Sequence, residues 1–85
     1  MADGDVPPLQ LLTREGCHLC VVAAETLTRI AGEEAGLPVE LVDVDADPEL
    51  RAEYGDLVPV VLLDGREHSV FTVDVVRLRR DLGLG

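Results

Sequence analysis

The two cysteines are the residues of this 85-residue sequence best suited to chemistry, and they lie close together in the segment "TREGCHLCVVAAE". Cys17 and Cys20 are separated by two residues and are the only cysteines of the chain. A Cys-x-x-Cys pair suits reversible disulfide chemistry and also forms half of a structural zinc site. Strong four-ligand zinc sites join two such pairs, and this sequence has one. The spacing therefore favours two reactive thiols, with metal binding as an alternative.

The surroundings of the two cysteines predict different roles for their sulfur atoms. Cys17 follows a turn containing Gly16 and begins an expected helix, where unpaired backbone N–H groups and the helix dipole stabilise a thiolate. These groups lower the pKa of a thiol below its ordinary value. Cys20 lies one turn later on the apolar side of that helix and is expected to be more buried. We therefore expect Cys17 to attack a disulfide and Cys20 to resolve the mixed disulfide.

His18 lies between the cysteines and is expected to tune their redox potential. A protonated imidazole would place a positive charge beside the thiolate, stabilise the reduced form and make the disulfide more oxidising. Glu15, two residues before Cys17, would act in the opposite direction. The alternative is that His18 is an exposed residue at the helix N-terminus without a special role.

Composition and charge restrict the partners of this chain. The formal net charge is −10 and all seven basic residues are arginines, so we expect neither nucleic acid nor a membrane as a partner. The N-terminal "MADGDVPPLQ" lacks the features of a signal peptide, and no apolar run approaches the roughly 18 residues of a membrane span. We expect a cytoplasmic monomer, with residues 1–85 as a single domain and frayed ends at 1–6 and 83–85. In the cytoplasm a lasting structural disulfide is disfavoured.

Hydrophobic periodicity and turn residues predict alternating strands and helices. The expected strands are 9–13, 39–45, 60–63 and 66–71, and the expected helices are 17–34, 48–54 and 72–82. Asp47 and Thr72 are expected to cap the second and third helices, and the Asp64-Gly65 pair favours a tight hairpin. The strand–helix–strand start predicts a parallel pair with a right-handed crossover. The prediction is an α/β fold, βαβαββα, with a four-stranded mixed sheet flanked by three helices.

This order of elements resembles the thioredoxin fold, and "LLTREGCHLC" followed by "VDVDADPELRAEYGDLVPVVLLDG" resembles the small bacterial glutaredoxin-like proteins. The resemblance covers roughly residues 9–82. It implies a cis Val58-Pro59 peptide bond, with Pro59 facing the redox cysteines. It also implies that Arg14, three positions before Cys17, helps to bind glutathione. Where glutaredoxins have a Gly-Gly pair and a polar or acidic residue for the γ-glutamyl end of glutathione, this chain has "SVFTVD", and only Asp74 can stand in.

The resemblance implies a glutaredoxin-like thiol-disulfide oxidoreductase. It would act on protein or small-molecule disulfides and be re-reduced by glutathione, another low-molecular-weight thiol or a reductase. We expect no tightly bound cofactor and no metal. The site residues implied fall into three groups: catalytic Cys17 and Cys20; redox-tuning His18 and Pro59; and thiol-substrate-binding Arg14, Val58, Pro59 and Asp74.

Two other functions stay open at this point. For metal binding, a single chain offers Cys17, Cys20, His18 and His68 as ligands. Two chains could also share an iron–sulfur cluster or a metal through the Cys pair, with external thiols. Alternatively, the chain could be a non-catalytic thioredoxin-fold module that docks a basic partner on its acidic surface. Its two aromatic residues, Tyr54 and Phe71, are too few for a rich binding surface, and we expect them to pack in the core or at its edge.

Overall fold

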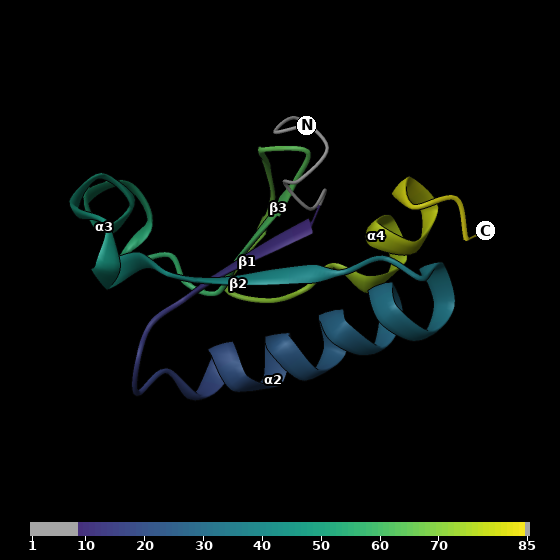
Figure 1. Cartoon of the computed structure of the whole chain (residues 1–85), viewed down its shortest axis with the longest axis horizontal. Coiled ribbons are helices and arrows are strands. Elements are labelled where there is room, and N and C mark those ends of the chain that lie inside the picture. Colours follow the sequence, from purple (N-terminus) through teal and green to yellow (C-terminus); the bar gives the residue numbers. More distant parts are fainter. Residues whose placement is uncertain (1–8, 85) are drawn as a thin grey trace.

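The computed structural model describes residues 9–84 and contains the expected alternation of strands and helices (Figure 1). The expectation of frayed ends at 1–6 and 85 lies outside the described residues. The strands are β1 (Leu9–Thr13), β2 (Val39–Asp43), β3 (Val60–Leu63) and β4 (Arg66–Val70). The helices are α2 (His18–Thr28), its π-helical continuation η1 (Arg29–Ala35), the 3-10 turn η2 (Val44–Ala46), α3 (Pro48–Tyr54) and α4 (Val75–Asp81).

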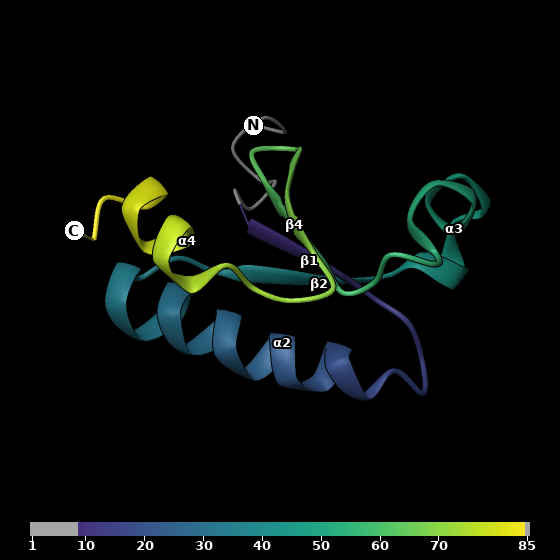
Figure 2. The ribbon, with the colours of Figure 1, turned by 180° about the vertical axis from the view of Figure 1, so that it is seen from behind.

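The strands form one mixed sheet in the order β2-β1-β3-β4. β1 and β2 are parallel, as predicted for a strand–helix–strand unit, and the other two pairs are antiparallel. Two views from opposite sides show α2 running along the sheet (Figures 1 and 2). α3 lies at the end of the molecule where β1 leads into α2, and α4 lies at the opposite end. The predicted fold class is confirmed.

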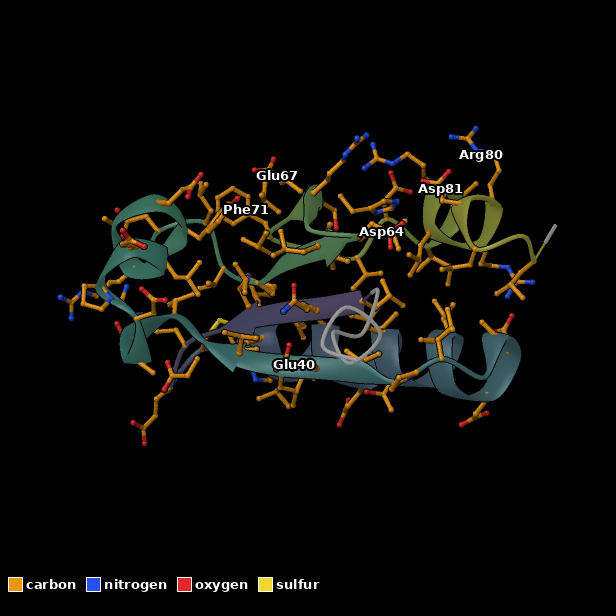
Figure 3. The ribbon with its side chains drawn as sticks, turned by 45° about the horizontal axis from the view of Figure 1, so that its top comes forward. Glu40, Asp64, Glu67, Phe71, Arg80 and Asp81 are labelled. Carbon is orange, nitrogen blue, oxygen red and sulfur yellow. A yellow bond between two sulfur atoms is a disulfide. The ribbon has the colours of Figure 1, made fainter. Side chains whose placement is uncertain are left out.

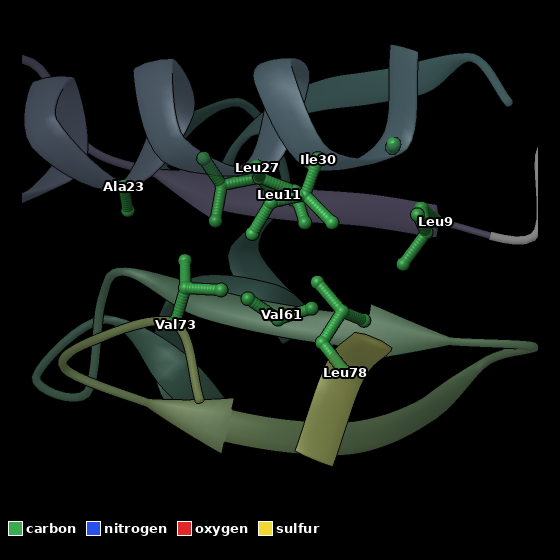
Figure 4. Close-up of a cluster of buried hydrophobic side chains, with 9 residues drawn as sticks. Leu9, Leu11, Ala23, Leu27, Ile30, Val61, Val73 and Leu78 are labelled. Atoms are coloured by element: carbon green, nitrogen blue, oxygen red, sulfur yellow. The ribbon is translucent and has the colours of Figure 1, made fainter. Parts of the chain in front are cut away.

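Alternation along β1 divides the apolar residues between the two faces of the sheet. Leu9 and Leu11 belong to a core cluster with α2, η1 and α4, whereas Leu12 belongs to a second cluster beside α3. Figure 4 shows the larger cluster between α2 and β1 on one side and β3 with α4 on the other. Its buried members are Leu9, Leu11, Ala23, Leu27, Ile30, Ala31, Val61, Val73 and Leu78. The helix that carries the cysteines is therefore anchored by its apolar stripe.

The first helical segment, expected over 17–34, ends at Ala35 with Gly36 as its C-cap, and its last turns are π-helical. Gly36 has φ 67, in the left-handed region that glycine adopts readily. The Leu37 N–H donates to the Ala31 carbonyl at 2.8 Å and closes the helix end. Within residues 9–84, no helix combines the length and apolar character required to cross a membrane.

The β3-β4 hairpin turns at Asp64 and Gly65, as predicted. Both residues have positive φ, 55 for Asp64 and 82 for Gly65, which is the pattern of a type I′ turn. The register then shifts within the hairpin: Val61 lies opposite Ser69, but Leu62 lies opposite Glu67. His68 is therefore the extra residue of a β-bulge.

The prediction for the last helix is wrong in two respects. α4 begins at Val75 and is capped by Asp74, whose Oδ1 accepts the Arg77 N–H at 3.1 Å, so Thr72 is not the cap. The sequence also predicts an apolar stripe of Val75, Val76, Leu78 and Leu82 on this helix. Leu78 is buried, but Val75 and Val76 are exposed. The residues that follow α4 are hydrogen-bonded to its C-terminal end: the N–H groups of Gly83 and Leu84 donate to the carbonyls of Arg80 and Arg79.

Packing predicts that Leu27→Ala lowers the free energy of unfolding by about 2–5 kcal/mol, because it leaves a cavity in the larger cluster. Urea unfolding followed by circular dichroism measures this change. The matched control is Val76→Ala, at a residue that is 80% exposed, with an expected change within about 0.5 kcal/mol. Equal stabilities of the two variants would contradict the assignment of Leu27 to the core.

Tyr54, the single tyrosine, is expected to ionise above the usual pH range of a tyrosine. Its pKa is raised from 10.0 by burial and, to a smaller extent, by the negative charges of Glu53 and Glu67. Because the folded state favours the neutral phenol, stability is constant below the unfolded-state pKa and falls as pH rises toward the folded-state pKa. Tyrosinate absorbance, compared in native buffer and in urea, tests the shift; coincident titrations would contradict it.

Candidate functional site

A tight turn connects β1 to Cys17, which lies at the start of α2. Gly16 has φ 81, in the left-handed region that favours glycine. The Cys17 N–H donates to the Arg14 carbonyl at 3.1 Å and closes the turn. The chain thus passes from a buried strand into the helix within a few residues, and the position of Cys17 is set by the core that holds both elements.

Cys17 is the N-cap of α2, and its sulfur takes the place of the usual capping oxygen. Its backbone is extended (φ −93, ψ 105), and Sγ accepts the Cys20 N–H at 3.2 Å. The expected location of Cys17 beside the backbone N–H groups at the helix N-terminus is confirmed. A negative charge on this sulfur would be stabilised by that hydrogen bond and by the helix dipole.

Cys17 and Cys20 form a disulfide with a Cα–Cα distance of 5.2 Å, which is within the usual range for disulfides. The two residues differ in their contact with solvent: Cys17 is half-buried, whereas Cys20 is only 4% exposed and lies on the buried face of α2. The sulfur of Cys17 is therefore the one that an external molecule can approach more readily.

The disulfide opens onto a cleft of about 510 Å³. Four of the predicted site residues line it together: Arg14, Cys17, His18 and Cys20. Its other lining residues are Thr13, Glu15, Gly16, Val21, Ala24 and Leu41. Among the described residues, the other three predicted site residues (Val58, Pro59 and Asp74) do not line this cleft.

Arg14 is held in place by the segment around α3. Its Nε donates to Asp45 Oδ2 at 3.0 Å and its Nη1 donates to the Gly55 carbonyl at 3.1 Å. The side chain is about 39% exposed and also lines the cleft. An anionic group entering the cleft would therefore meet a guanidinium that is fixed in position and already paired with one carboxylate.

His18 and Glu15 are both exposed at the edge of the cleft. Water screens the charges of exposed side chains, which weakens their effect on a neighbouring sulfur. Both residues for which opposing influences on Cys17 were predicted are therefore in contact with solvent.

Val58 and Pro59 lie at the same end of the sheet as Cys17. β3 begins at Val60, which pairs with Leu12 near the end of β1, and Cys17 follows β1 after a short turn. The Val58-Pro59 peptide bond is cis, and Pro59 is fully buried. The Pro59 carbonyl accepts the Phe71 N–H at 2.7 Å, so this segment is also joined to the end of β4.

Asp74 has a structural task at the start of α4, apart from any contact with a substrate. Its carboxylate caps the helix through the Arg77 N–H and is half-buried. The resemblance implied a contact with glutathione for this residue, and any such contact would have to share the carboxylate with the cap.

Two apolar residues of the cleft, Val21 and Leu41, were not recognised from the sequence. Leu41 lies opposite Leu11 in the parallel β1-β2 register and is exposed. No local pattern distinguishes it from the other apolar residues of its strand, because only the register and the position of α2 place it at the cleft.

The candidate metal ligands are not grouped around the cysteines. Within residues 9–84 no cluster of three or more His, Cys, Asp or Glu side chains is arranged to hold a metal ion. His68 lies on β4, and its Nε2 is 2.9 Å from Asp81 Oδ2. Its backbone carbonyl accepts a hydrogen bond from Arg77.

Known proteins resemble this chain in sequence and in fold. The model of the glutaredoxin-like domain (DUF836) matches residues 8–83. An uncharacterised protein of Mycobacterium tuberculosis is 51% identical over 81 residues, covering 89% of this chain and 82% of that protein.

Two solved structures share the fold. A protein from Nitrosomonas europaea (Ne2328) has a TM-score of 0.74 and 26% identity, covering 89% of this chain and 92% of its own. The thioredoxin-like protein BC3987 has a TM-score of 0.63 and 21% identity, covering 94% and 100%, and shows the fold alone. The fold is thioredoxin-like, and the family match together with the Cys17–Cys20 pair supports a thiol-redox role in general.

The capping role of Asp74 predicts a difference between two substitutions. Asp74→Ala should lower the free energy of unfolding by about 1 kcal/mol, whereas Asp74→Asn, which can still cap, should change it by no more than a few tenths. Urea unfolding of both variants measures the difference. If the two substitutions destabilised the chain equally, the carboxylate would act through its charge and not through the cap.

Proposed function

The chain belongs to the glutaredoxin-like domain family, and on that basis we propose that it is a thiol-disulfide oxidoreductase in which Cys17 attacks and Cys20 resolves. The observation that carries this proposal is the hydrogen bond from the Cys20 N–H to Cys17 Sγ at the N-terminus of α2. A backbone donor at that position stabilises a thiolate, which is the form of cysteine that attacks disulfides.

The first step transfers a covalent bond from the substrate to Cys17. The Cys17 thiolate attacks one sulfur of the substrate disulfide, a new S–S bond forms, and the old one breaks. The departing substrate sulfur leaves as a thiolate and takes a proton from water. The product is a mixed disulfide between Cys17 and the other half of the substrate.

The second step closes the ring between the two cysteines. Cys20 loses its proton, and its thiolate attacks Cys17 Sγ and expels the remaining substrate sulfur as a thiolate, which is then protonated. Overall, two protein thiols are oxidised to a disulfide and one substrate disulfide is reduced to two thiols. The low exposure of Cys20 supports this order, because an external disulfide can approach Cys17 more easily.

Return to the dithiol requires two electrons from outside the chain. We propose that a low-molecular-weight thiol, such as glutathione, or a reductase supplies them in the cytoplasm, and that the protein acts as a monomer. Arg14 would attract an anionic thiol, since its guanidinium lines the cleft beside Cys17. Val58, Pro59 and Asp74 would contact the thiol substrate, and His18 and Pro59 would tune the redox potential.

The decisive test compares the two single-cysteine variants. Cys17→Ser should lower the rate of disulfide reduction by at least about 10³-fold, because it removes the covalent nucleophile. Cys20→Ser should still attack but should accumulate the mixed disulfide, which mass spectrometry detects as an adduct on Cys17. The two variants control for each other, because each keeps one thiol.

Full activity of Cys17→Ser would refute the assignment. If the wild-type protein and both variants failed to reduce any disulfide, the oxidoreductase function itself would be refuted. Iron and visible absorbance in protein purified without oxygen, together with no turnover, would indicate the shared cluster instead.

A further inference from the structure

Most of the exposed large apolar side chains line two hollows beside α2, the helix that carries Cys20. Among residues 9–84, seven large apolar residues are exposed, and six of them line one of two hollows at the start of α2. Only Val76 lies outside both hollows. Concentration of exposed apolar surface at one place on a small protein is typical of a binding site.

One of these hollows, of about 170 Å³, is here named the apolar groove. It lies between Leu19 and Val22 of α2 and the segment from Phe71 to Val75. That segment follows β4 and runs back beside α2 before α4 begins (Figure 2). Leu19 lies between the two cysteines in the sequence, so the groove reaches the helical turn that carries them, although neither cysteine lines it. None of its lining residues is charged.

Phe71 enters the groove from a strained backbone. Its φ is 70, a conformation that non-glycine residues rarely adopt. Its N–H donates to the carbonyls of Pro59 at 2.7 Å and Leu57 at 3.3 Å, and these hydrogen bonds hold the strained turn. The side chain is 50% exposed beyond the end of β4 (Figure 3), so burial of the ring in the core does not account for the strain. A ring held in this way, in a groove that also includes Leu19 of the Cys-x-x-Cys segment, is available to contact a substrate.

We propose that the apolar groove selects polypeptide disulfides in which an apolar side chain neighbours the reacting cysteine, in preference to glutathione disulfide. This inference rests on the proposed function, because it concerns the substrate that reaches Cys17. A polypeptide attached to Cys17 must pass over the neighbouring surface, and the groove is an apolar part of that surface with no charged lining residue. The apolar side chain beside the reacting cysteine of the substrate would be buried against Leu19, Phe71 and Val75.

Charge argues against glutathione as the occupant. Glutathione carries two carboxylates and an ammonium group, and the groove lining offers no charged partner to compensate their loss of water. The net charge of −10 also repels an anionic peptide and favours a neutral or basic one. An apolar side chain gains from the same lining and positions its cysteine sulfur for attack.

The test uses the reduced full-length protein in single turnover, with no reductant present. Four disulfides are compared: two peptides of equal charge with leucine or serine beside the cysteine, glutathione disulfide, and the small uncharged hydroxyethyl disulfide. Acid quench, alkylation and mass spectrometry measure the formation of the Cys17–Cys20 disulfide. The leucine peptide should react about tenfold faster than the serine peptide, the scale of one apolar contact, and faster than glutathione disulfide.

Two variants examine the groove itself. Phe71→Gly removes the ring and suits the positive φ, so the fold should tolerate it. The ratio of the leucine-peptide rate to the hydroxyethyl disulfide rate should fall about tenfold in this variant. Val76→Ser, at an apolar residue that is 80% exposed and outside the groove, should leave the ratio unchanged.

The outcomes separate this inference from the proposed function. Reaction with hydroxyethyl disulfide, combined with equal rates for the two peptides, would overturn the selection and leave the oxidoreductase function standing. Faster reaction with glutathione disulfide than with the leucine peptide would also overturn it, as would an unchanged ratio in Phe71→Gly. No reaction with any of the four disulfides would overturn both.

Discussion

The hydrogen bond from the Cys20 N–H to Cys17 Sγ is the interaction on which the site depends. The Cys20 N–H lies in the first turn of α2 and is shared between the Cys17 carbonyl, at 3.2 Å, and the Cys17 sulfur, also at 3.2 Å. The same contact therefore starts the helix and favours the thiolate. Its geometry is maintained by the core, because Ala23 and Leu27 fix α2 against the sheet. A shift of this helix would move the sulfur away from the cleft.

The first turns of α2 have two faces with different uses. One face is buried and carries Cys20 into the protein, where access from solvent is small. The other face exposes Leu19, Val21 and Val22, although water contact with these side chains is unfavourable. The first turns of α2 thus expose apolar side chains within a few residues of Cys17 and Cys20. Exposed apolar surface gathered in one place is typical of a site that another molecule covers.

The segments that surround the disulfide are joined to one another through the sheet. Antiparallel pairing of β1 with β3 brings Pro59 to the end of the sheet where Cys17 lies, and the Pro59 carbonyl holds Phe71. Arg14 connects the turn before Cys17 to the region around α3 through Asp45 and Gly55. Residues far apart in the sequence therefore share one end of the molecule, joined by strand pairing, by the Phe71–Pro59 backbone hydrogen bond and by the side chain of Arg14.

The sequence by itself determined the features that depend on neighbouring residues. Helix and strand order, the Asp64-Gly65 turn and the location of Cys17 at a helix start follow from periodicity, turn chemistry and capping, which act over a few residues. The predicted cap of the last helix was nevertheless wrong. Both Thr72 and Asp74 are suitable capping residues, and the side chain that accepts a backbone N–H at the start of α4 is that of Asp74. Tyr54 packs against a core cluster, as the sequence suggested.

Only the tertiary structure decided which residues meet. It exposed Val75, a member of the apolar stripe predicted for the last helix, and it left Phe71, predicted to pack in the core or at its edge, 50% exposed. It also brought Leu41 to the cleft. It also paired Arg14 with Asp45, which lies 31 residues further along the chain. These contacts depend on strand register and on the rotation of each helix about its axis, which are set by packing between distant segments and leave no local pattern in the sequence.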